Sequence, residues 1–280
     1  MSGLGSEPMP PSWLAGGMET PVLSTLELIH APDSPVATLL LNRPSKLNAL
    51  SAELLGEIVT ACRWLTEATE IRVVVVRGAG RAFSAGFDLG DFGGLEDGPS
   101  HRDVADLGRL ATEALTDVRP LTIAAVHGHC VGGGLVLAAA CDLRLAASDT
   151  TFSIPEVDLG IPLAWGGIPR LVRELGPAIT KELVLTCRPF GAGEARELRF
   201  LNRVVEPELL IVEADALAVE LAGKPWFSIR ATKSQVNAVM DEIAGTGRNA
   251  NDADTLVAAM SDEESRAASR RYLSQRRGQR

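Results

Sequence analysis

Two glycine-rich segments hold residue types from which a reaction centre could be built. The segment SAGFD at 84–88 follows an apolar, β-branched run at 71–77, and HGHCVGGG at 127–134 follows a second apolar run at 121–126. Glycine allows main-chain N–H groups to face a ligand without an intervening side chain, and N–H groups at the start of a helix favour negative charge. If the two loops converge, they predict a site that stabilises an oxyanion. Tight turns alone would also account for these glycines.

Other familiar motifs do not fit the sequence. No Gly-Lys-Ser/Thr follows either glycine-rich loop, which excludes a phosphate-binding P-loop, and neither G-x-G-x-x-G nor G-x-S-x-G occurs. The four cysteines are scattered through apolar stretches without C-x-x-C spacing or clustered histidines, so we expect packed, reduced thiols and no metal site. They are Cys62, Cys130, Cys141 and Cys187.

Composition limits the class of protein. The chain has 280 residues, 46% of them hydrophobic, with 27 Lys and Arg against 36 Asp and Glu, a formal charge of -9. Such a chain is long enough to bury a large core, and its acidic balance gives no reason to expect a nucleic-acid partner. No apolar run reaches the roughly 18 residues of a membrane span, and the N-terminus lacks the pattern of a secretory signal. We therefore expect a cytoplasmic protein with no membrane partner.

Strand and helix patterns alternate through most of the chain. Ser51 is placed to cap a helix whose apolar residues recur at helical spacing up to Leu65, and a second helical pattern near 104–114 stops at Pro120. Alternation of this kind predicts an α/β fold with parallel crossovers. The strand-like stretches are 26–29, 36–41, 71–77, 121–126, 143–146 and 152–154.

The two ends of the chain differ from this middle part. Residues 1–18 are rich in Gly, Pro and Ser, which predicts a flexible leader. Residues 19–200 form the predicted α/β core, and 201–280 a helical C-terminal region. Its helical patterns are at 209–221, 229–243 and 255–272.

Four motifs together resemble the enoyl-CoA hydratase/isomerase, or crotonase, family. They are LNRPSKLNAL at 41–50, RAFSAGFDL at 81–89, HGHCVGGGLVLAAACDLRLA at 127–146 and SIPEVDLGIPLAWGG at 153–167. The resemblance runs in order over about residues 20–275. It implies a crotonase-like core of parallel strands with ββα-type units, and a C-terminal helical region that forms a homotrimer or a dimer of trimers. It also implies an acyl-CoA or enoyl-CoA thioester as substrate, with coenzyme A part of that substrate and no separate cofactor.

The resemblance assigns roles to individual residues. The N–H groups of Phe87 and Gly133 would form the oxyanion hole, and Lys46, with the region of Arg43, would face the CoA phosphates. Asp88 matches the motif as well, although a structural carboxylate that satisfies the loop backbone is its expected role. The CoA-binding residues implied are Lys46, Ala85, Gly86, Phe87, Asp88, Leu89, Gly132 and Gly133.

One departure from the family pattern bears on the reaction. Hydratases of this family use two glutamates, and the first falls here on Val136, whereas Glu156 keeps the second. A single carboxylate suffices to remove a proton from C2 of an enoyl chain and return it at C4. We therefore expect an enoyl-CoA isomerase of fatty-acid metabolism with Glu156 as the catalytic residue. An enoyl-CoA hydratase and a non-catalytic acyl-CoA-binding protein are the alternatives.

Several further residues near the motifs have open roles. Trp165 stands where the family commonly has a small residue, and either narrows the acyl pocket or packs beneath the loop. Asp158 would share a face with Glu156 if this segment were extended, but a structural or solvated acid is the preferred interpretation. Structural roles are also preferred for His127 and His129. Six arginines near the C-terminus suggest a solvated helix end or, less favoured, a contact with CoA phosphates: Arg266, Arg270, Arg271, Arg276, Arg277 and Arg280.

Overall fold

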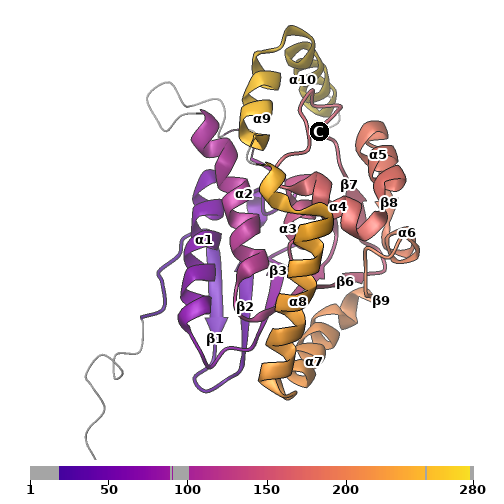
Figure 1. The fold of residues 1–280 in the computed structure, drawn as a ribbon. Coiled ribbons are helices and arrows are strands. Elements are labelled where there is room, and N and C mark those ends of the chain that lie inside the picture. The colour runs from indigo at the N-terminus through magenta and orange to yellow at the C-terminus, as the bar shows by residue number, and fades with distance from the viewer. Residues whose placement is uncertain (1–18, 89, 91–100, 250, 278–280) are drawn as a thin grey trace, which may run out of the picture.

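A six-stranded sheet forms the centre of the molecule (Figure 1). The computed structural model describes residues 19–88, 90, 101–249 and 251–277. The first two strands are antiparallel, and every later neighbour in the sheet is parallel. Because parallel neighbours need crossover connections, helices fall between these strands, as the sequence predicts. In sheet order the strands are β1 (Leu26–His30), β2 (Val36–Leu41), β3 (Val73–Gly78), β4 (Leu121–Val126), β6 (Leu143–Ala147) and β9 (Arg203–Val205).

Both faces of this sheet are covered. Strand β3 points Val74 and Val76 into a core shared with α1, α2 and α3, and Val73 and Val75 into a second core beneath α7. A strand buried on both faces has no polar alternation, which explains its continuous run of valines. These four helices are α1 (Ala52–Glu67), α2 (His101–Asp117), α3 (Gly133–Ala139) and α7 (Leu210–Ala222).

A small second sheet follows the carboxyl ends of the central strands. Strand β4 leads through a turn into β5, which runs into α3, and β6 leads into β7, so the chain repeats a ββα unit. Strand β5 is parallel to β7, and β7 is antiparallel to β8. The predicted core of parallel strands with ββα-type units is therefore present. The remaining elements here are β5 (His129–Val131), β7 (Thr151–Ser153), β8 (Phe190–Gly191), α4 (Gly167–Leu175), α5 (Pro177–Thr186) and α6 (Ala192–Glu197).

Helices make up the C-terminal region, with two differences from the sequence prediction. The stretch expected as one helix at 255–272 is two helices, because the extended backbone at Asp262 ends the first. The Asp262 carboxylate then accepts the N–H of Ser265 at 2.9 Å and caps the second. Strand β9 belongs to the main sheet although it lies beyond the predicted boundary at 200. The helices are α8 (Trp226–Ala244), α9 (Asp252–Ser261) and α10 (Glu263–Arg277), and short 3-10 turns cover Pro44–Lys46, Pro207–Leu209 and Thr246–Asn249.

The last helices return to the core. Helix α9 packs against α2, and α10 packs against α9, so the two lie together beyond one end of the sheet, at the top of Figure 1. Lys233 fixes α8 through its Nζ, which lies 2.9 Å from Asp142 Oδ2 and donates at 2.8 Å to the carbonyl oxygens of Val118 and Pro120. Within the described residues, no helix has both the length and the apolar character needed to cross a bilayer.

Candidate active site

A cavity of about 40 Å³ lies where the two glycine-rich loops meet. Phe87 from the first loop, Gly133 from the second and Glu156 all line it. The structure therefore brings together the three residues that the sequence indicated for chemistry. The described lining residues are Phe87, Ala105, Gly133, Val136, Glu156, Ile161, Pro162, Leu163, Ala164, Trp165 and Leu256.

The first loop is held by main-chain hydrogen bonds to residues 47–50. Ala85 N–H donates to the carbonyl of Leu47 at 2.9 Å, and Asp88 N–H donates to that of Leu50 at 3.0 Å. Leu50 N–H donates in return to the carbonyl of Gly86 at 2.8 Å. These bonds on either side of Phe87 fix the peptide groups around it. The motif at 41–50 is thus a support for the loop.

Buried polar side chains also order this loop. Asn48 is fully buried, and its Nδ2 donates to the carbonyls of Ala79 and Ala82 at 2.8 and 2.7 Å. Ser84 Oγ donates to the Asn48 carbonyl and accepts the N–H of Gly86. Neither residue was among the sequence candidates, although Asn48 stands inside the first motif.

The second loop approaches the first so closely that a side chain would not fit between them. Gly86 has φ +87°, and a Cβ built on it would lie 2.8 Å from the carbonyl oxygen of Val131 and 3.7 Å from the nitrogen of Gly133. Gly133 is the first residue of α3, so its N–H has no acceptor within the helix. The start of a helix also carries partial positive charge. This geometry suits a negatively charged oxygen near Gly133.

Glu156 lies in a turn that follows β7. It is 9% exposed, and a Cβ built on Gly132 would overlap its carboxylate, so glycine is needed there as well. Glu156 Oε2 is buried and meets no donor from the described protein. Burial raises the pKa of Glu156 to about 7, because the charged form loses its hydration, while a hydrogen bond from its own backbone acts in the opposite direction. A carboxyl group of this kind can both accept and release a proton near neutral pH.

Val136 forms an apolar part of the cavity wall. It is 0% exposed and lies on α3, against Gly167 at the start of α4. Glu156 is consequently the only ionisable side chain among the described residues that line the cavity.

The other candidates lie outside the cavity. Asp88 Oδ2 is 2.9 Å from Arg43, and its other oxygen accepts the N–H of Gly90 at 3.2 Å, so it holds the loop. Lys46 is exposed on the Pro44–Lys46 turn. Leu89 falls outside the described residues. Asp158 is exposed in the turn over 156–160, so the extended arrangement that would align it with Glu156 does not occur.

The second loop has two histidines, and neither lines the cavity. His127 Nε2 contacts the carbonyl of Gly80 at 2.9 Å, and His129 is exposed at the start of β5. Of the C-terminal arginines, Arg266 and Arg270 line a separate hollow against Leu159, Gly160 and Ile161.

Trp165 is one of the residues that line the cavity. It is 5% exposed, and its ring meets that of Phe87 edge-on, with the ring centroids 5.6 Å apart. Two other lining residues, Ala105 on α2 and Leu256 on α9, were missed by sequence reasoning. Each looks like an ordinary apolar helix residue, and only the packing of α9 on α2 brings them to the site.

Comparison with known proteins agrees with the resemblance in the sequence. A family model described as enoyl-CoA hydratase/isomerase matches residues 32–279. A crotonyl-CoA hydratase of Syntrophomonas wolfei is 34% identical over 211 residues, which cover 75% of this chain and 81% of that protein. A peroxisomal Δ(3,5)-Δ(2,4)-dienoyl-CoA isomerase of Arabidopsis thaliana is 35% identical over 225 residues, 75% of this chain and 80% of that protein.

Solved structures give the same result. An enoyl-CoA hydratase/carnithine racemase from Magnetospirillum magneticum has 31% identity and a TM-score of 0.74, over 79% of this chain and 83% of that one. An enoyl-CoA hydratase/isomerase from Mycobacterium paratuberculosis has 27% identity and a TM-score of 0.81, over 89% of this chain and 99% of that one. The chain thus has the crotonase fold and belongs to the enoyl-CoA hydratase/isomerase family.

Proposed function

We propose that this protein is an enoyl-CoA isomerase that moves a double bond by transferring one proton. The observation that carries this proposal is a single carboxyl group, Glu156, with a pKa of about 7, in an otherwise apolar cavity that Phe87 and Gly133 also line. Members of the family are enzymes that act on enoyl-CoA thioesters, and the proposal selects one of their reactions.

The reaction needs one base and one site for negative charge. The Glu156 carboxylate removes a proton from C2 of a 3-enoyl thioester, and the electron pair moves onto the thioester oxygen. The N–H groups of Phe87 and Gly133 stabilise that oxygen, with each such donor lowering a barrier by about 3 to 4 kcal/mol where it has been measured. Glu156, now protonated, returns the same proton to C4 as the double bond forms between C2 and C3. Glu156 alone therefore both removes and returns the proton.

Hydration would require further functional groups in the site. A water molecule must be oriented and deprotonated as it attacks, and Val136 provides neither a hydrogen bond nor a base. The names of several relatives, such as the crotonyl-CoA hydratase, nevertheless favour hydration as a second candidate. Val136, together with the small cavity, favours a third, a protein that binds acyl-CoA without turning it over.

The substrate supplies the coenzyme A group, and we propose no separate cofactor, because proton transfer between carbons requires no redox chemistry. Ala85, Gly86, Asp88 and Gly132 lie on the loops beside the cavity, where they would line the path of the CoA arm, and exposed Lys46 would approach its phosphates.

We also propose a cytoplasmic homotrimer or dimer of trimers. Helix α8 supports this assembly, because it has no buried residue and presents Phe227, Val236, Val239 and Ile243 to solvent. Sedimentation velocity should give a trimeric or hexameric mass, and a monomer would contradict the proposed assembly.

One labelling experiment separates the three candidate functions. The protein is incubated with 2-enoyl- and 3-enoyl-CoA in deuterated water, and the products are analysed by mass spectrometry and NMR. Isomerisation interconverts the two substrates, with deuterium at C2 or C4 only where the proton on Glu156 exchanges with solvent, whereas hydration gives a 3-hydroxyacyl-CoA. Binding alone leaves both substrates unchanged.

Mutation then tests the role of Glu156. Glu156→Gln should lower turnover by orders of magnitude while leaving affinity for acyl-CoA unchanged. Asp158→Asn is the matched control, since Asp158 is exposed two residues further along the same turn. Turnover unchanged in Glu156→Gln would remove this residue from the mechanism.

A further inference from the structure

The indole of Trp165 lies against Phe87 and Gly133, the two residues proposed to bind the thioester oxygen. The ring lies between Gly108 on α2 and Gly133 on α3, and a Cβ built on either glycine would overlap it. The cavity that remains is about 40 Å³. On this measure one water needs about 10 to 15 Å³, so the cavity holds about three water-sized groups.

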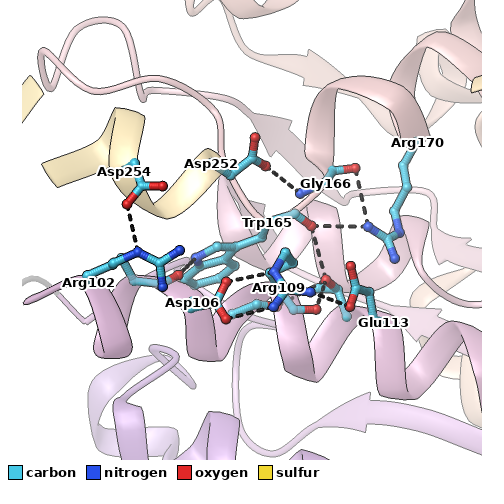
Figure 2. Close-up of polar contacts among 12 residues, drawn as sticks. Arg102, Asp106, Arg109, Glu113, Trp165, Gly166, Arg170, Asp252 and Asp254 are labelled. Atoms are coloured by element: carbon cyan, nitrogen blue, oxygen red, sulfur yellow. Dashed lines mark hydrogen bonds and ion pairs between the residues drawn. The ribbon is translucent and has the colours of Figure 1, made fainter. Parts of the chain in front are cut away.

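Hydrogen bonds hold this tryptophan in place. Its Nε1 donates to the carbonyl of Ala105 at 3.1 Å, and its own carbonyl accepts from Thr112 Oγ1 at 3.0 Å and from an Arg170 guanidinium nitrogen at 3.1 Å (Figure 2). Arg170 is itself 2% exposed. The ring and the backbone of Trp165 are thus both fixed to α2, and the backbone to α4 as well.

The backbone conformation of Trp165 also indicates that this residue is fixed in place. Its φ is +61°, a left-handed conformation that bulky residues rarely adopt and that costs about 1 to 3 kcal/mol. Such a conformation persists only where the surroundings impose it, and here the two hydrogen bonds to its carbonyl do so. A side chain placed at that cost and bonded at both ends acts as a fixed wall rather than a movable gate.

Helix α9 supports the wall from outside. Asp252 accepts the N–H of Gly166 at 2.8 Å, and Asp254 lies 2.6 Å from Arg102 on α2 (Figure 2). These contacts fix α9 over the loop that contains Trp165, and Leu256 of α9 then lines another side of the cavity. Leu256 and Trp165 are therefore two apolar walls of similar burial, which allows one to serve as a control for the other.

We propose that Trp165 is the specificity-determining residue of this site and restricts the acyl group to a short, unbranched chain of about butyryl size. The inference rests on the proposed function only for the class of ligand, an acyl-CoA thioester, and not for its turnover. Longer or branched acyl groups would meet the indole ring beside Gly133 before their thioester oxygen reached the N–H groups of Phe87 and Gly133.

Equilibrium binding tests this without requiring any reaction. The affinities of butyryl-, hexanoyl- and octanoyl-CoA are measured by calorimetry for the wild type, Trp165→Ala and Leu256→Ala. A methylene that enters an apolar pocket increases affinity about fourfold. The wild type should show no gain from butyryl to octanoyl, whereas Trp165→Ala should gain about fourfold for each methylene that the vacated space accepts. Leu256→Ala, which vacates less of the same cavity, should extend the range less than Trp165→Ala does.

Three results would overturn the proposal. They are an affinity of the wild type that rises with chain length, an unchanged preference in a folded Trp165→Ala, and a range extended by Leu256→Ala but not by Trp165→Ala. If Trp165→Ala does not fold, Trp165→Phe should extend the range by a smaller amount, and the wild-type series alone still decides against the proposal if longer chains bind more tightly.

The outcome is separable from that of the proposed function. Short-chain preference without any interconversion of 2-enoyl- and 3-enoyl-CoA would refute isomerisation and keep the role of Trp165. Interconversion by a wild type that binds octanoyl-CoA most tightly would support isomerisation and refute the role of Trp165. Absence of binding by every acyl-CoA would refute both.

Discussion

Replacing Glu156 with glutamine is expected to change how the stability of the protein depends on pH. In the folded protein the pKa of this carboxyl is raised from 4.5 to about 7 by burial. A rise of the pKa from 4.5 to about 7, at ~1.4 kcal/mol for each tenfold change in proton affinity, corresponds to roughly 3.5 kcal/mol. The group is 9% exposed, so solvent screening reduces this figure little.

The sign follows from where the proton is bound. Between pH 4.5 and about 7 the folded protein keeps a proton on Glu156 that the unfolded chain has lost. The free energy of unfolding therefore falls as the pH rises through this window, and the loss is complete above pH 7. Glutamine does not titrate, so Glu156→Gln should become more stable relative to the wild type by roughly 3.5 kcal/mol across the same window.

Denaturant unfolding at a series of pH values measures this difference. Burying an amide in place of a carboxyl also changes the free energy of unfolding, but by the same amount at every pH. Only the way in which the difference in unfolding free energy between mutant and wild type varies with pH therefore reports on the ionisation of Glu156. Asp158→Asn, which removes an exposed carboxyl from the same turn, is the control. If the Glu156→Gln difference is flat, the carboxyl is not held in a dry environment, and our account of it as a near-neutral acid and base is wrong.

Three further substitutions test the framework around the site. Gly86→Ala should destabilise by about 1 to 3 kcal/mol and abolish turnover, because φ is +87° and the new Cβ would lie 2.8 Å from the Val131 carbonyl oxygen; thermal melts and activity check this. Val136→Glu should cost about 2 to 7 kcal/mol in urea unfolding, since a polar group would enter a site with no exposure. Lys233→Ala should cost about 3 to 5 kcal/mol in the same assay, because Asp142 would keep a largely buried charge without its partner.

The parts of the fold set by short-range patterns could be read from the sequence. Ser51 caps α1 by accepting the N–H of Leu54, and the valine run of β3 is buried on both faces, as a strand beneath two layers of helix requires. Glu156 could be named because its neighbours matched a family motif, whereas its desolvation needed the structure. Burial depends on what packs around a residue, and a linear sequence does not state it.

The walls of the cavity show where sequence reasoning stops. Ala105 and Leu256 are about 150 positions apart, and no local pattern distinguishes them from other apolar residues on amphipathic helices. They meet because α9 folds back onto α2, a long-range contact. The helix break at Asp262 was not predicted for a related reason. The helical spacing of apolar residues continues across it, and only the backbone conformation changes.

The same desolvation links the stability of this protein to its proposed chemistry. A carboxylate in water has a pKa too low to hold a proton at neutral pH, so it could not return one to C4. The apolar walls formed by Val136, Trp165 and Leu256 remove water from Glu156, which raises its pKa and opposes folding above pH 7. A second glutamate at 136 would bring another negative charge into this space and raise that cost further. The single-carboxylate site and its tightly filled pocket are therefore parts of one arrangement, in which the walls that limit the substrate also tune the base.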